Sequence, residues 1–411
     1  MTSPSGAVAA PAHGADPATF RLASVALIMG GFGIGVTEFV TMGLLPQIAR
    51  GIGVDIPAAG HTISAYALGV VIGAPLLSVL GAKAPRRAML LGLMSAFAVA
   101  NALAAMAPNY ETLILARFAS GIPHGAFFGM ASLVAVSLAP RGHSGRAVGR
   151  IMLGIPIANI VGVPLATWVG QAYGWRSAYW AVAAVGVLTV VLVRLWVPRT
   201  EADPEQNWHR ELAAFRSTQV WLTIGVGAIG FGGMFAMYSY IAPTVTEVTG
   251  RPESWVPLFL LAFGVGSIVG TWLGGVLADW SVLRSLVING AIMAALLATF
   301  SFTAQWTVPA IVTVFAISMV TGAWVIGLQM RLMSVAGAAR NLGAAMNHAS
   351  LNFANATGAF LGGAVISAGY GYRAPSLVGA GLALGGLLLL AWSVAVHRRD
   401  TAATRAYGPA A

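Results

Sequence analysis

Long apolar segments recur along the whole chain, and this pattern limits the fold more than any other feature. An α-helix needs about 20 apolar residues to cross the hydrocarbon core of a bilayer. Twelve segments meet this length, near residues 22–45, 61–82, 87–107, 111–138, 151–171, 175–197, 218–243, 255–279, 284–304, 308–333, 341–369 and 374–396. The sequence therefore predicts an all-α membrane protein with twelve transmembrane helices.

The composition agrees with a membrane environment and argues against a soluble fold. Only 8% of the residues are charged and 58% are hydrophobic, and the mean hydropathy is +0.81. Soluble domains carry about 25% charged residues. A chain with this composition has too few polar groups to cover its apolar surface in water. Lipid is the solvent that it requires.

The basic balance of the chain does not indicate a nucleic-acid partner. The pI is near 10.6, but the basic residues form short clusters between the apolar segments and not one continuous patch. That distribution is typical of the excess of Lys and Arg in the cytoplasmic loops of membrane proteins. We expect no nucleic acid among the partners.

Several enzyme classes are excluded by missing residues. The chain has no cysteine, and its seven histidines never fall three or four positions apart, so no helix carries a two-histidine metal motif. Lys83 is the only lysine and is followed by Ala84, which excludes a Walker A loop. We expect no enzyme activity, no metal and no cofactor. Uphill transport would then use an ion gradient or a separate ATPase subunit.

The basic residues also predict an orientation. An even number of spans puts both termini on one side, and most of the 22 basic residues fall in loops on that side. Those loops hold Arg21, Lys83, Arg86, Arg87, Arg141, Arg146, Arg150, Arg194, Arg199, Arg210, Arg216, Arg284, Arg331, Arg340, Arg398, Arg399 and Arg405. The opposite side holds Arg50, Arg176, Arg251 and Arg373, and Arg117 lies inside a span. This bias predicts cytoplasmic termini in a bacterial-type inner membrane.

The longest predicted loop divides the chain near its middle. The expected organisation is a cytoplasmic tail (1–21), a six-helix bundle (22–197), a central loop (198–217), a second six-helix bundle (218–397) and a second cytoplasmic tail (398–411). The first apolar segment is too long for a signal-peptide core, so we keep it as the first span.

The central loop has a pattern of its own. Asp203 and Pro204 suit the N-cap and first position of a helix, and Trp208, Leu212 and Phe215 then share one helical face. The pattern predicts a short amphipathic helix on the inner membrane surface. A disordered linker is the alternative.

The two bundles show an internal repeat at a constant offset of 197 residues. Pro46 maps to Pro243, Tyr173–Arg176 maps to Tyr370–Arg373, Gly125-Ala126 maps to Gly322-Ala323, and Arg87 maps to Arg284. Each pair occupies the same place in its half, so chance matching in a glycine-rich chain does not explain the set. Six plus six spans with the same orientation is a parallel repeat, which places a binding site near the bilayer midplane.

Four motifs make the resemblance to a known family specific. Residues 274–279, Gly-Gly-Val-Leu-Ala-Asp, with Arg284 after them, resemble the G-x-L-A-D-R signature of the major facilitator superfamily. Residues 117–125 resemble its fourth-helix motif, and residues 154–164 resemble the Gly/Pro-rich fifth-helix motif of its antiporters. Residues 37–46 resemble the arabinose-efflux-like branch of its twelve-span drug:proton antiporters.

This resemblance covers about residues 20–397. It implies a multidrug-type efflux transporter that works by alternating access, with small molecules and protons as partners and a monomer as the functional unit. It also implies a gating role for the loop motifs. Asp279 is expected to act with Arg284 or Arg340, and Arg86 and Arg87 occupy the first-half motif. There the expected aspartate is replaced by Ala82, so the first half lacks that acidic partner.

Glu38 and Arg117 are the residues we single out for coupling. Ionisable side chains inside a membrane cost several kcal/mol and are candidates for function by default. Glu38 is the one acidic residue deep in a predicted span, about 12 Å inward from Pro46 at ~1.5 Å per residue. Arg117 lies about 9 Å inward from Glu111 on the same side. Glu38 is therefore predicted to carry the proton, and a static Glu38–Arg117 ion pair is the alternative.

Other polar and aromatic residues are candidates for the substrate cavity. His124 follows Arg117 by two turns on the same face, and His348, Asn352 and Asn355 form a stripe on the eleventh span. Asn159 lies at mid-depth in the fifth span, and the resemblance adds Tyr238, Tyr240 and Trp324 on spans seven and ten. The alternative for the amides is helix–helix packing, and for the aromatic residues it is ordinary packing.

The sequence thus predicts a proton-coupled transporter that exports a small amphipathic molecule of the drug, sugar or nucleoside class. An uncoupled facilitator or a sugar importer of the same fold is the first alternative. A channel or a membrane sensor is the alternative from another class. The repeat and the lack of a filter-like loop argue against a channel, and the lack of a soluble domain argues against a sensor.

Overall fold

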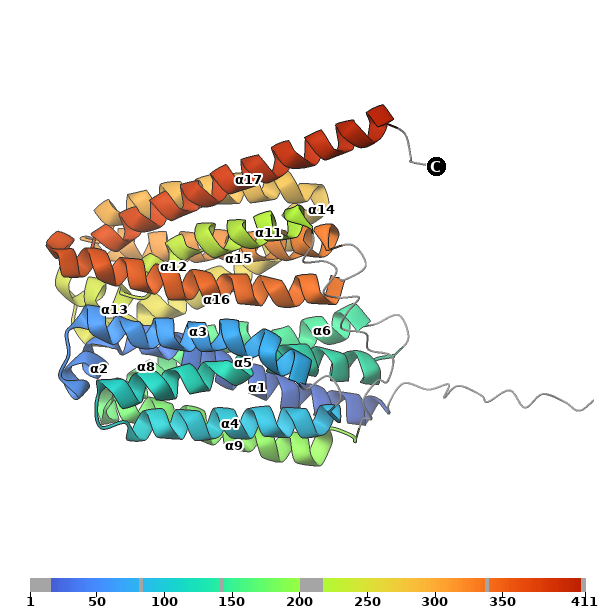
Figure 1. Cartoon of the computed structure of the whole chain (residues 1–411). Coiled ribbons are helices and arrows are strands. Elements are labelled where there is room, and N and C mark those ends of the chain that lie inside the picture. Colours follow the sequence, from blue (N-terminus) through green and yellow to red (C-terminus); the bar gives the residue numbers. More distant parts are fainter. Residues whose placement is uncertain (1–15, 81–83, 141–143, 200–216, 337–339, 408–411) are drawn as a thin grey trace, which may run out of the picture.

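The computed structural model describes residues 16–80, 84–140, 144–199, 217–336 and 340–407, without the side chains of 78–80, 144–146, 340–345 and 397–407. Within these ranges the chain forms helices and no strands (Figure 1). The position of Ala82 and the central loop with its predicted amphipathic helix lie outside the described residues.

The first half contains ten helical segments that make six spans. They are α1 (Pro17–Gly43), α2 (Leu45–Ile52), α3 (Ile56–Leu80), α4 (Arg86–Met106), α5 (Tyr110–Leu138), α6 (Ser144–Met152), α7 (Gly154–Ile157), the π-helix η1 (Ala158–Gly162), α8 (Val163–Tyr173) and α9 (Trp175–Trp196). The four segments from α6 to α8 follow one another without a loop and form the fifth span.

The second half repeats this plan. Its segments are α11 (Thr218–Gly225), the π-helix η3 (Val226–Gly230), α12 (Gly232–Tyr238), α13 (Ile241–Pro243), the π-helix η4 (Thr244–Val248), the 3₁₀-helix η5 (Glu253–Trp255), α14 (Val256–Thr303), α15 (Thr307–Val335), α16 (Arg340–Val365), the π-helix η6 (Ile366–Tyr370) and α17 (Ala374–Tyr407). In α14 the backbone is extended at Ser281, with a φ of −172°, so this segment contains two spans.

The helices agree with the twelve predicted spans. Ten stretches of the described chain are long and apolar enough to cross a membrane, and one of these is the 51-residue stretch Glu253–Thr303 that the break at Ser281 divides. The 26 residues of α16 supply the remaining span. α1 begins five residues before the predicted span, and α17 continues well beyond its span. A helix does not end where its apolar stretch ends, which explains both differences.

Local sequence sets the start of several helices. The Asp16 carboxylate accepts hydrogen bonds from the backbone N–H groups of Ala18 and Thr19, at 3.2 and 3.4 Å, and Pro17 occupies the first helical position. At the start of α5, Asn109 and Thr112 form a reciprocal capping box. Such caps satisfy backbone donors that have no partner within the helix.

Glycines bring α3 and α5 into close contact. A Cβ atom at Gly69 would overlap the carbonyl oxygen of Phe118, and one at Gly121 would overlap the carbonyl oxygen of Tyr66. Gly73 approaches α5 in the same way one turn further along. Small residues allow this approach between membrane helices, where packing replaces the hydrophobic effect as the source of association.

The same packing recurs in the second half at the offset seen in the sequence. Gly266 and Gly270 lie 197 positions after Gly69 and Gly73, and a Cβ atom at either would overlap a backbone carbonyl oxygen of α15, at Phe315 or Met319. The repeat therefore holds in three dimensions as well as in the motifs. The two halves use one helix-packing pattern twice.

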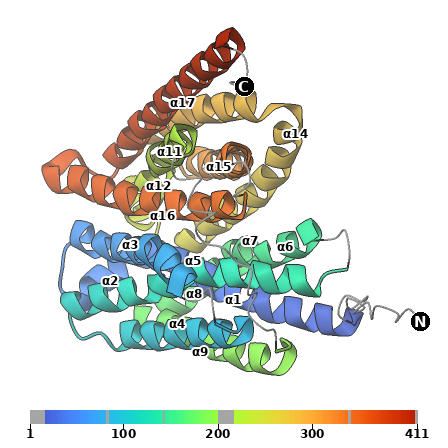
Figure 2. The ribbon, with the colours of Figure 1, turned by 45° about the vertical axis from the view of Figure 1, so that its right-hand side comes forward.

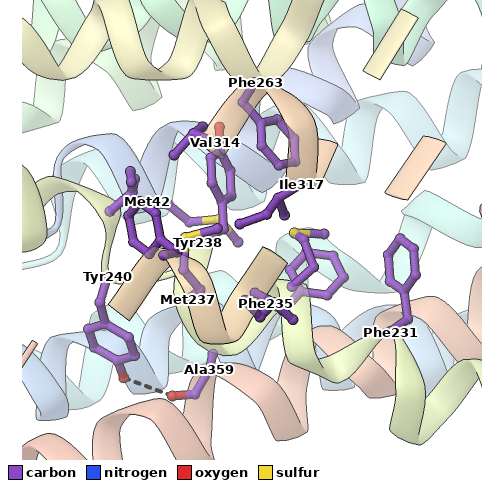
Figure 3. Packing of buried hydrophobic residues seen from close by; sticks show 14 of the residues in the cluster. Met42, Phe231, Phe235, Met237, Tyr238, Tyr240, Phe263, Val314, Ile317 and Ala359 are labelled. Atoms are coloured by element: carbon purple, nitrogen blue, oxygen red, sulfur yellow. Dashed lines mark hydrogen bonds between the residues drawn. The ribbon is translucent and has the colours of Figure 1, made fainter. Parts of the chain in front are cut away.

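The halves form two groups of helices that face each other (Figure 2). α16 of the second half lies along α3 of the first, where the Ser64 hydroxyl donates a 2.9 Å hydrogen bond to the carbonyl oxygen of Ala356. Aromatic residues of α12 and α14 pack against Phe39 and Met42 of α1 in one buried cluster (Figure 3). We call the side on which α1 begins and α17 ends the terminal side.

Candidate functional site

Glu38 lies buried on α1, where the two halves meet. Its side chain is 6% exposed. Its electrostatic neighbours are the guanidinium group of Arg117 on α5 and the amide of Asn355 on α16. The structure therefore gathers predicted residues from both halves around one carboxyl group. Among the described residues the carboxylate forms no ion pair, since Arg50–Glu253 is the pair found there.

Arg117 is held by a residue that the sequence did not single out. Its side chain is fully buried. Its two terminal nitrogens donate to the hydroxyl and the carbonyl oxygen of Thr37, at 3.0 and 3.2 Å. The Thr37 hydroxyl in turn donates to Asn101 at 2.6 Å. Arg117 thus adjoins α1 at the predicted depth, but Thr37, not Glu38, accepts its hydrogen bonds.

Two tyrosine rings complete the surroundings of Arg117. The guanidinium carbon lies 4.4 Å from the ring centre of Tyr66 on α3 and 5.4 Å from that of Tyr179 on α9. Such cation–π contacts stabilise a desolvated cation by about 2 kcal/mol or more. The Tyr179 hydroxyl also shares a 2.7 Å hydrogen bond with Thr41. The cation is therefore stabilised here without a carboxylate partner.

His124 forms a buried hydrogen bond with Tyr66. The hydroxyl of Tyr66 lies 2.9 Å from Nδ1 of His124, and both side chains are 1% exposed. Nε2 of His124 is buried and has no hydrogen-bond partner among the described residues. Tyr66 is also an electrostatic neighbour of both Glu38 and Arg117. The tyrosine therefore connects His124 to the group around Glu38.

The polar stripe on α16 lies beside this group. His348 stacks on Phe128 of α5, with ring centres 5.8 Å apart and planes 3° apart. Asn352 donates to the carbonyl oxygen of His348 at 3.0 Å, while its side-chain oxygen has no partner. Asn355 is fully buried, and neither polar atom of its amide has a hydrogen-bond partner within the ranges that the structure describes.

Asn159 lies in the π-helical segment η1 of the fifth span. Its side-chain oxygen is buried and without a partner. A Cβ atom at Gly264 of α14 would overlap its carbonyl oxygen, so η1 and α14 are in direct contact. Single π-helical turns within α-helices occur often at functional sites. Asn159 therefore belongs to the interface between the halves.

Tyr238 and Tyr240 lie in a packed hydrophobic cluster (Figure 3), and Trp324 belongs to the same cluster. Tyr238 stacks on Phe263 with ring centres 3.9 Å apart, and Phe39 lies 6.1 Å from Tyr238. The Tyr240 hydroxyl donates to the carbonyl oxygen of Ala359 at 2.8 Å. Trp324 is fully buried, and its ring nitrogen has no partner. The hydroxyl of Tyr240 is thus used by the fold.

The described residues that are expected to act in gating do not contact one another through hydrogen bonds or ion pairs. Asp279 is exposed and forms no ion pair within the described part of the chain, and the Arg284 guanidinium lies 5.5 Å from the ring centre of Trp280. Arg86 and Arg87 donate to the carbonyl oxygens of Leu133 and Arg194. The side chain of Arg340 lies outside the described residues.

A polar cluster joins the halves on the face opposite the terminal side. Arg50 and Gln47 of α2 donate to the two carboxylate oxygens of Glu253, at 2.7 and 2.9 Å. Gln171 of α8 donates to the Glu253 carbonyl oxygen at 2.8 Å. The sequence did not indicate this cluster, because its residues lie at the ends of the spans or between them. The halves are therefore in contact on that face.

Comparison with known proteins identifies relatives over nearly the whole chain. The family model "Major Facilitator Superfamily" matches residues 27–346. The inner membrane transport protein YdhP of Escherichia coli is 42% identical over 377 residues, which are 92% of this chain and 97% of YdhP. The E. coli transporter AraJ is 31% identical over 85% of this chain and 89% of its own.

Two further matches are informative. The chloramphenicol resistance protein of Streptomyces lividans is 31% identical over 87% of this chain and 92% of its own length. Among solved structures, a mutant of the nucleoside transporter NupG superposes with a TM-score of 0.74 at 13% identity, over 91% of this chain and 99% of NupG. The structural match shows a shared fold, and the sequence matches show shared descent.

Proposed function

Because the chain belongs to the Major Facilitator Superfamily, a family of transporters and not of enzymes, we propose that it is a proton-coupled exporter of small amphipathic molecules. It works by alternating access of a central site between the two halves. The observation that carries this proposal is Glu38, a buried carboxyl group on α1 that has Arg117 and Asn355 as electrostatic neighbours and forms no ion pair with any described residue.

The surroundings of Glu38 suit a group that changes its protonation state. A charged carboxylate inside a membrane is costly, while a nearby cation favours it. Arg117 already has Thr37 and two tyrosine rings as partners, so it does not fix Glu38 in a static ion pair. Movement of either half changes the distance from Glu38 to Asn355, which lies on the other half. Such a carboxyl group links proton binding to the position of the halves.

The lining of the interface favours an uncharged substrate with apolar and hydrogen-bonding parts. Aromatic rings of Phe39, Tyr238 and Phe263 offer apolar surface. The amides of Asn159 and Asn355 offer buried polar atoms that have no hydrogen-bond partner in the described part of the chain. Chloramphenicol, named for the Streptomyces relative, has this chemistry. Sugars and nucleosides are the other substrate classes, and an uncoupled facilitator or sugar importer is the second candidate function.

We place both termini in the cytoplasm of a bacterial inner membrane, in agreement with the basic residues of the loops and with the name of YdhP. The bundles are assigned to residues 22–197 and 218–397, and Asp279 with Arg284 is assigned to the gate on the cytoplasmic side. The protein acts as a monomer.

Cysteine labelling tests this orientation. Single cysteines at Ala202 and Thr401 are expected to react with a membrane-impermeant maleimide only from the cytoplasmic side, and one at the exposed position Arg251 only from outside. The chain has no native cysteine, so each variant reports one position. Intact cells and inside-out vesicles give the two readings. Labelling at position 251 from the cytoplasmic side would invert the assigned topology.

Replacement of Arg117 is expected to move the pH dependence of transport. Arg117→Met removes the positive neighbour of Glu38 but keeps most of the side-chain volume between the two tyrosine rings. Without that charge the ionised form of Glu38 is less stable, so the carboxyl group keeps its proton to a higher pH. We expect the transport optimum to rise by about one pH unit or more, which corresponds to about 1.4 kcal/mol.

The matched control for that shift is Arg251→Met, which removes an exposed arginine next to Trp255. Its pH optimum should equal that of the wild type, and transport rates at a series of pH values give both results. An unchanged or lower optimum in Arg117→Met would show that the arginine does not act on the coupling group.

Transport by everted vesicles tests the function as a whole. A thermal-shift screen of antibiotics, sugars and nucleosides on the purified protein first identifies the ligand, with chloramphenicol as the first probe. We expect the ligand to accumulate in everted vesicles with an acidic lumen. Accumulation should stop when an ionophore collapses the proton gradient. Transport that equilibrates the ligand and ignores the gradient would instead identify a facilitator.

A further inference from the structure

A series of polar side chains leads from Glu38 toward the terminal side. Tyr66 is the first, because it is an electrostatic neighbour of Glu38. His124 follows through the 2.9 Å hydrogen bond between the tyrosine hydroxyl and Nδ1. His348 comes next, since it is an electrostatic neighbour of His124 and stacks on Phe128, whose ring also contacts His124. These residues come from α1, α3, α5 and α16.

The depths of these residues in their helices agree with this direction. Tyr66 lies ten residues into α3, or about 15 Å from its start, and His124 lies fourteen residues into α5, or about 21 Å. Both helices start on the face opposite the terminal side (Figure 1). His348 lies eight residues, or about 12 Å, from the start of α16 on the terminal side. Glu38, only five residues before the end of α1, is nearest the opposite face.

The chemistry of the two middle residues suits proton transfer. A tyrosine hydroxyl accepts and donates a hydrogen bond at the same time, and a neutral imidazole accepts at one nitrogen and donates at the other. Tyr66 and His124 already share one such bond. Nε2 of His124 is buried and has no hydrogen-bond partner among the residues that the structure describes, so it can exchange a hydrogen with water or with a neighbouring side chain.

His348 is the last residue of this series on the terminal side. The side chain of His348 is partly exposed, whereas those of Tyr66 and His124 are only 1% exposed. His348 is therefore the residue of the series that is most accessible to water. Three charged or titratable groups from neighbouring helices act on Tyr66 and His124, namely Glu38 of α1, Arg117 of α5 and His348 of α16. Arg117 is the cation among them, and it disfavours a second positive charge on the path. Transfer through a neutral tyrosine avoids that charge.

We propose that Tyr66 and His124 carry the proton between Glu38 and His348, on the route to the terminal side. The inference rests on the proposed function of Glu38. Glu38 gives its proton to the Tyr66 oxygen, Tyr66 passes its hydroxyl hydrogen to Nδ1 of His124, and His124 releases the hydrogen on Nε2 toward His348 and water. One proton enters and one leaves, so both residues end neutral. Glu38 and Tyr66 are not directly hydrogen-bonded, so the first transfer needs a water or a rotation of the carboxyl group.

Time-resolved infrared spectroscopy tests this route without a substrate. A light flash releases protons from a caged compound outside the full-length protein in lipid nanodiscs, and the carboxyl band of Glu38 reports its protonation. Glu38→Gln assigns the band. We expect Tyr66→Phe to slow protonation of Glu38 by about 100-fold, the range in which loss of a positioned proton carrier slows transfer. The end point of the titration should not move.

The control and a second variant separate the route from a general structural effect. Tyr179→Phe also removes a buried hydroxyl from a ring that faces Arg117, and it should leave the rate unchanged. His124→Gln should slow protonation as Tyr66→Phe does, which keeps the test valid if one variant does not fold.

Each outcome has a distinct meaning. Wild-type rates in Tyr66→Phe or His124→Gln would overturn the route alone. Equal slowing in Tyr179→Phe would also overturn it, because the effect would not depend on the tyrosine–histidine bond. A carboxyl band that survives in Glu38→Gln would overturn the proton site and the route together.

Discussion

Gly121→Val is expected to prevent normal folding of the first half. A Cβ atom at Gly121 would overlap the carbonyl oxygen of Tyr66 and approach the backbone nitrogen of Val70, so α5 could not approach α3. The obstacle is backbone and cannot rotate away. Overpacking of this kind costs about 1–3 kcal/mol, and a rigid backbone contact is at the upper end. The same displacement would pull Tyr66 away from Arg117 and His124.

Gly129→Val is the matched control for this prediction. Gly129 lies two turns further along α5, and a Cβ atom there meets nothing within 4 Å. Both variants change the helix propensity of α5 equally, so a difference between them reports the contact with α3. We expect Gly121→Val to lower the thermal midpoint of the purified protein by about 5 °C or more, or to yield no monodisperse protein. Equal midpoints for the two variants would contradict the close packing.

The sequence was sufficient for the fold because membrane helices have an unambiguous signal. Each span is a long apolar stretch, and the twelve predicted spans correspond to the helices of the structure. The offset of 197 residues also predicted which helix contacts are equivalent in the two halves, which the motifs alone did not. It relates Gly69 and Gly73 to Gly266 and Gly270, which make equivalent contacts in the two halves. The ends of α1 and α17 were less predictable, because a helix can continue past the apolar stretch.

The candidate site was only partly predictable. Glu38 and Arg117 were found because ionisable residues inside spans are rare and costly. Thr37 and Tyr66 carry no such signal, since threonine and tyrosine are common in membrane helices and neither is charged at neutral pH. Their importance depends on the rotation of α1 and α3 about their axes, which hydropathy does not report. One clue was present: Thr37 directly precedes Glu38 in the motif that gave the resemblance.

The contact between the halves was the least predictable feature. Glu253 lies in a short connection outside the predicted spans, and its partners Arg50, Gln47 and Gln171 come from 82 to 206 positions away in the chain. The internal repeat relates equivalent positions in the two halves but does not say which surfaces meet. Such contacts also change during alternating access, so a single sequence pattern cannot specify them.

Glu38→Gln is the second change with a large expected effect. The amide keeps the shape and hydrogen-bonding capacity of the side chain but cannot titrate. We expect the substrate to bind as before and proton coupling to disappear. Exchange of one proton for a neutral substrate across 100 mV supplies about 2.3 kcal/mol, enough for roughly fifty-fold accumulation. The variant should therefore equilibrate its substrate without accumulating it. A structural role predicts the reverse, namely loss of folded protein with coupling retained in what survives.

Proton release on addition of substrate is the most direct measurement of this role. Wild-type protein in weakly buffered proteoliposomes with a pH indicator dye should release protons when the substrate identified by the thermal-shift screen is added. Glu111→Gln, which removes an exposed carboxyl group at the start of α5, should behave as the wild type. Glu38→Gln should release none, although thermal shift still shows substrate binding. Proton release by Glu38→Gln equal to that of the wild type would contradict the account and place the coupling group elsewhere.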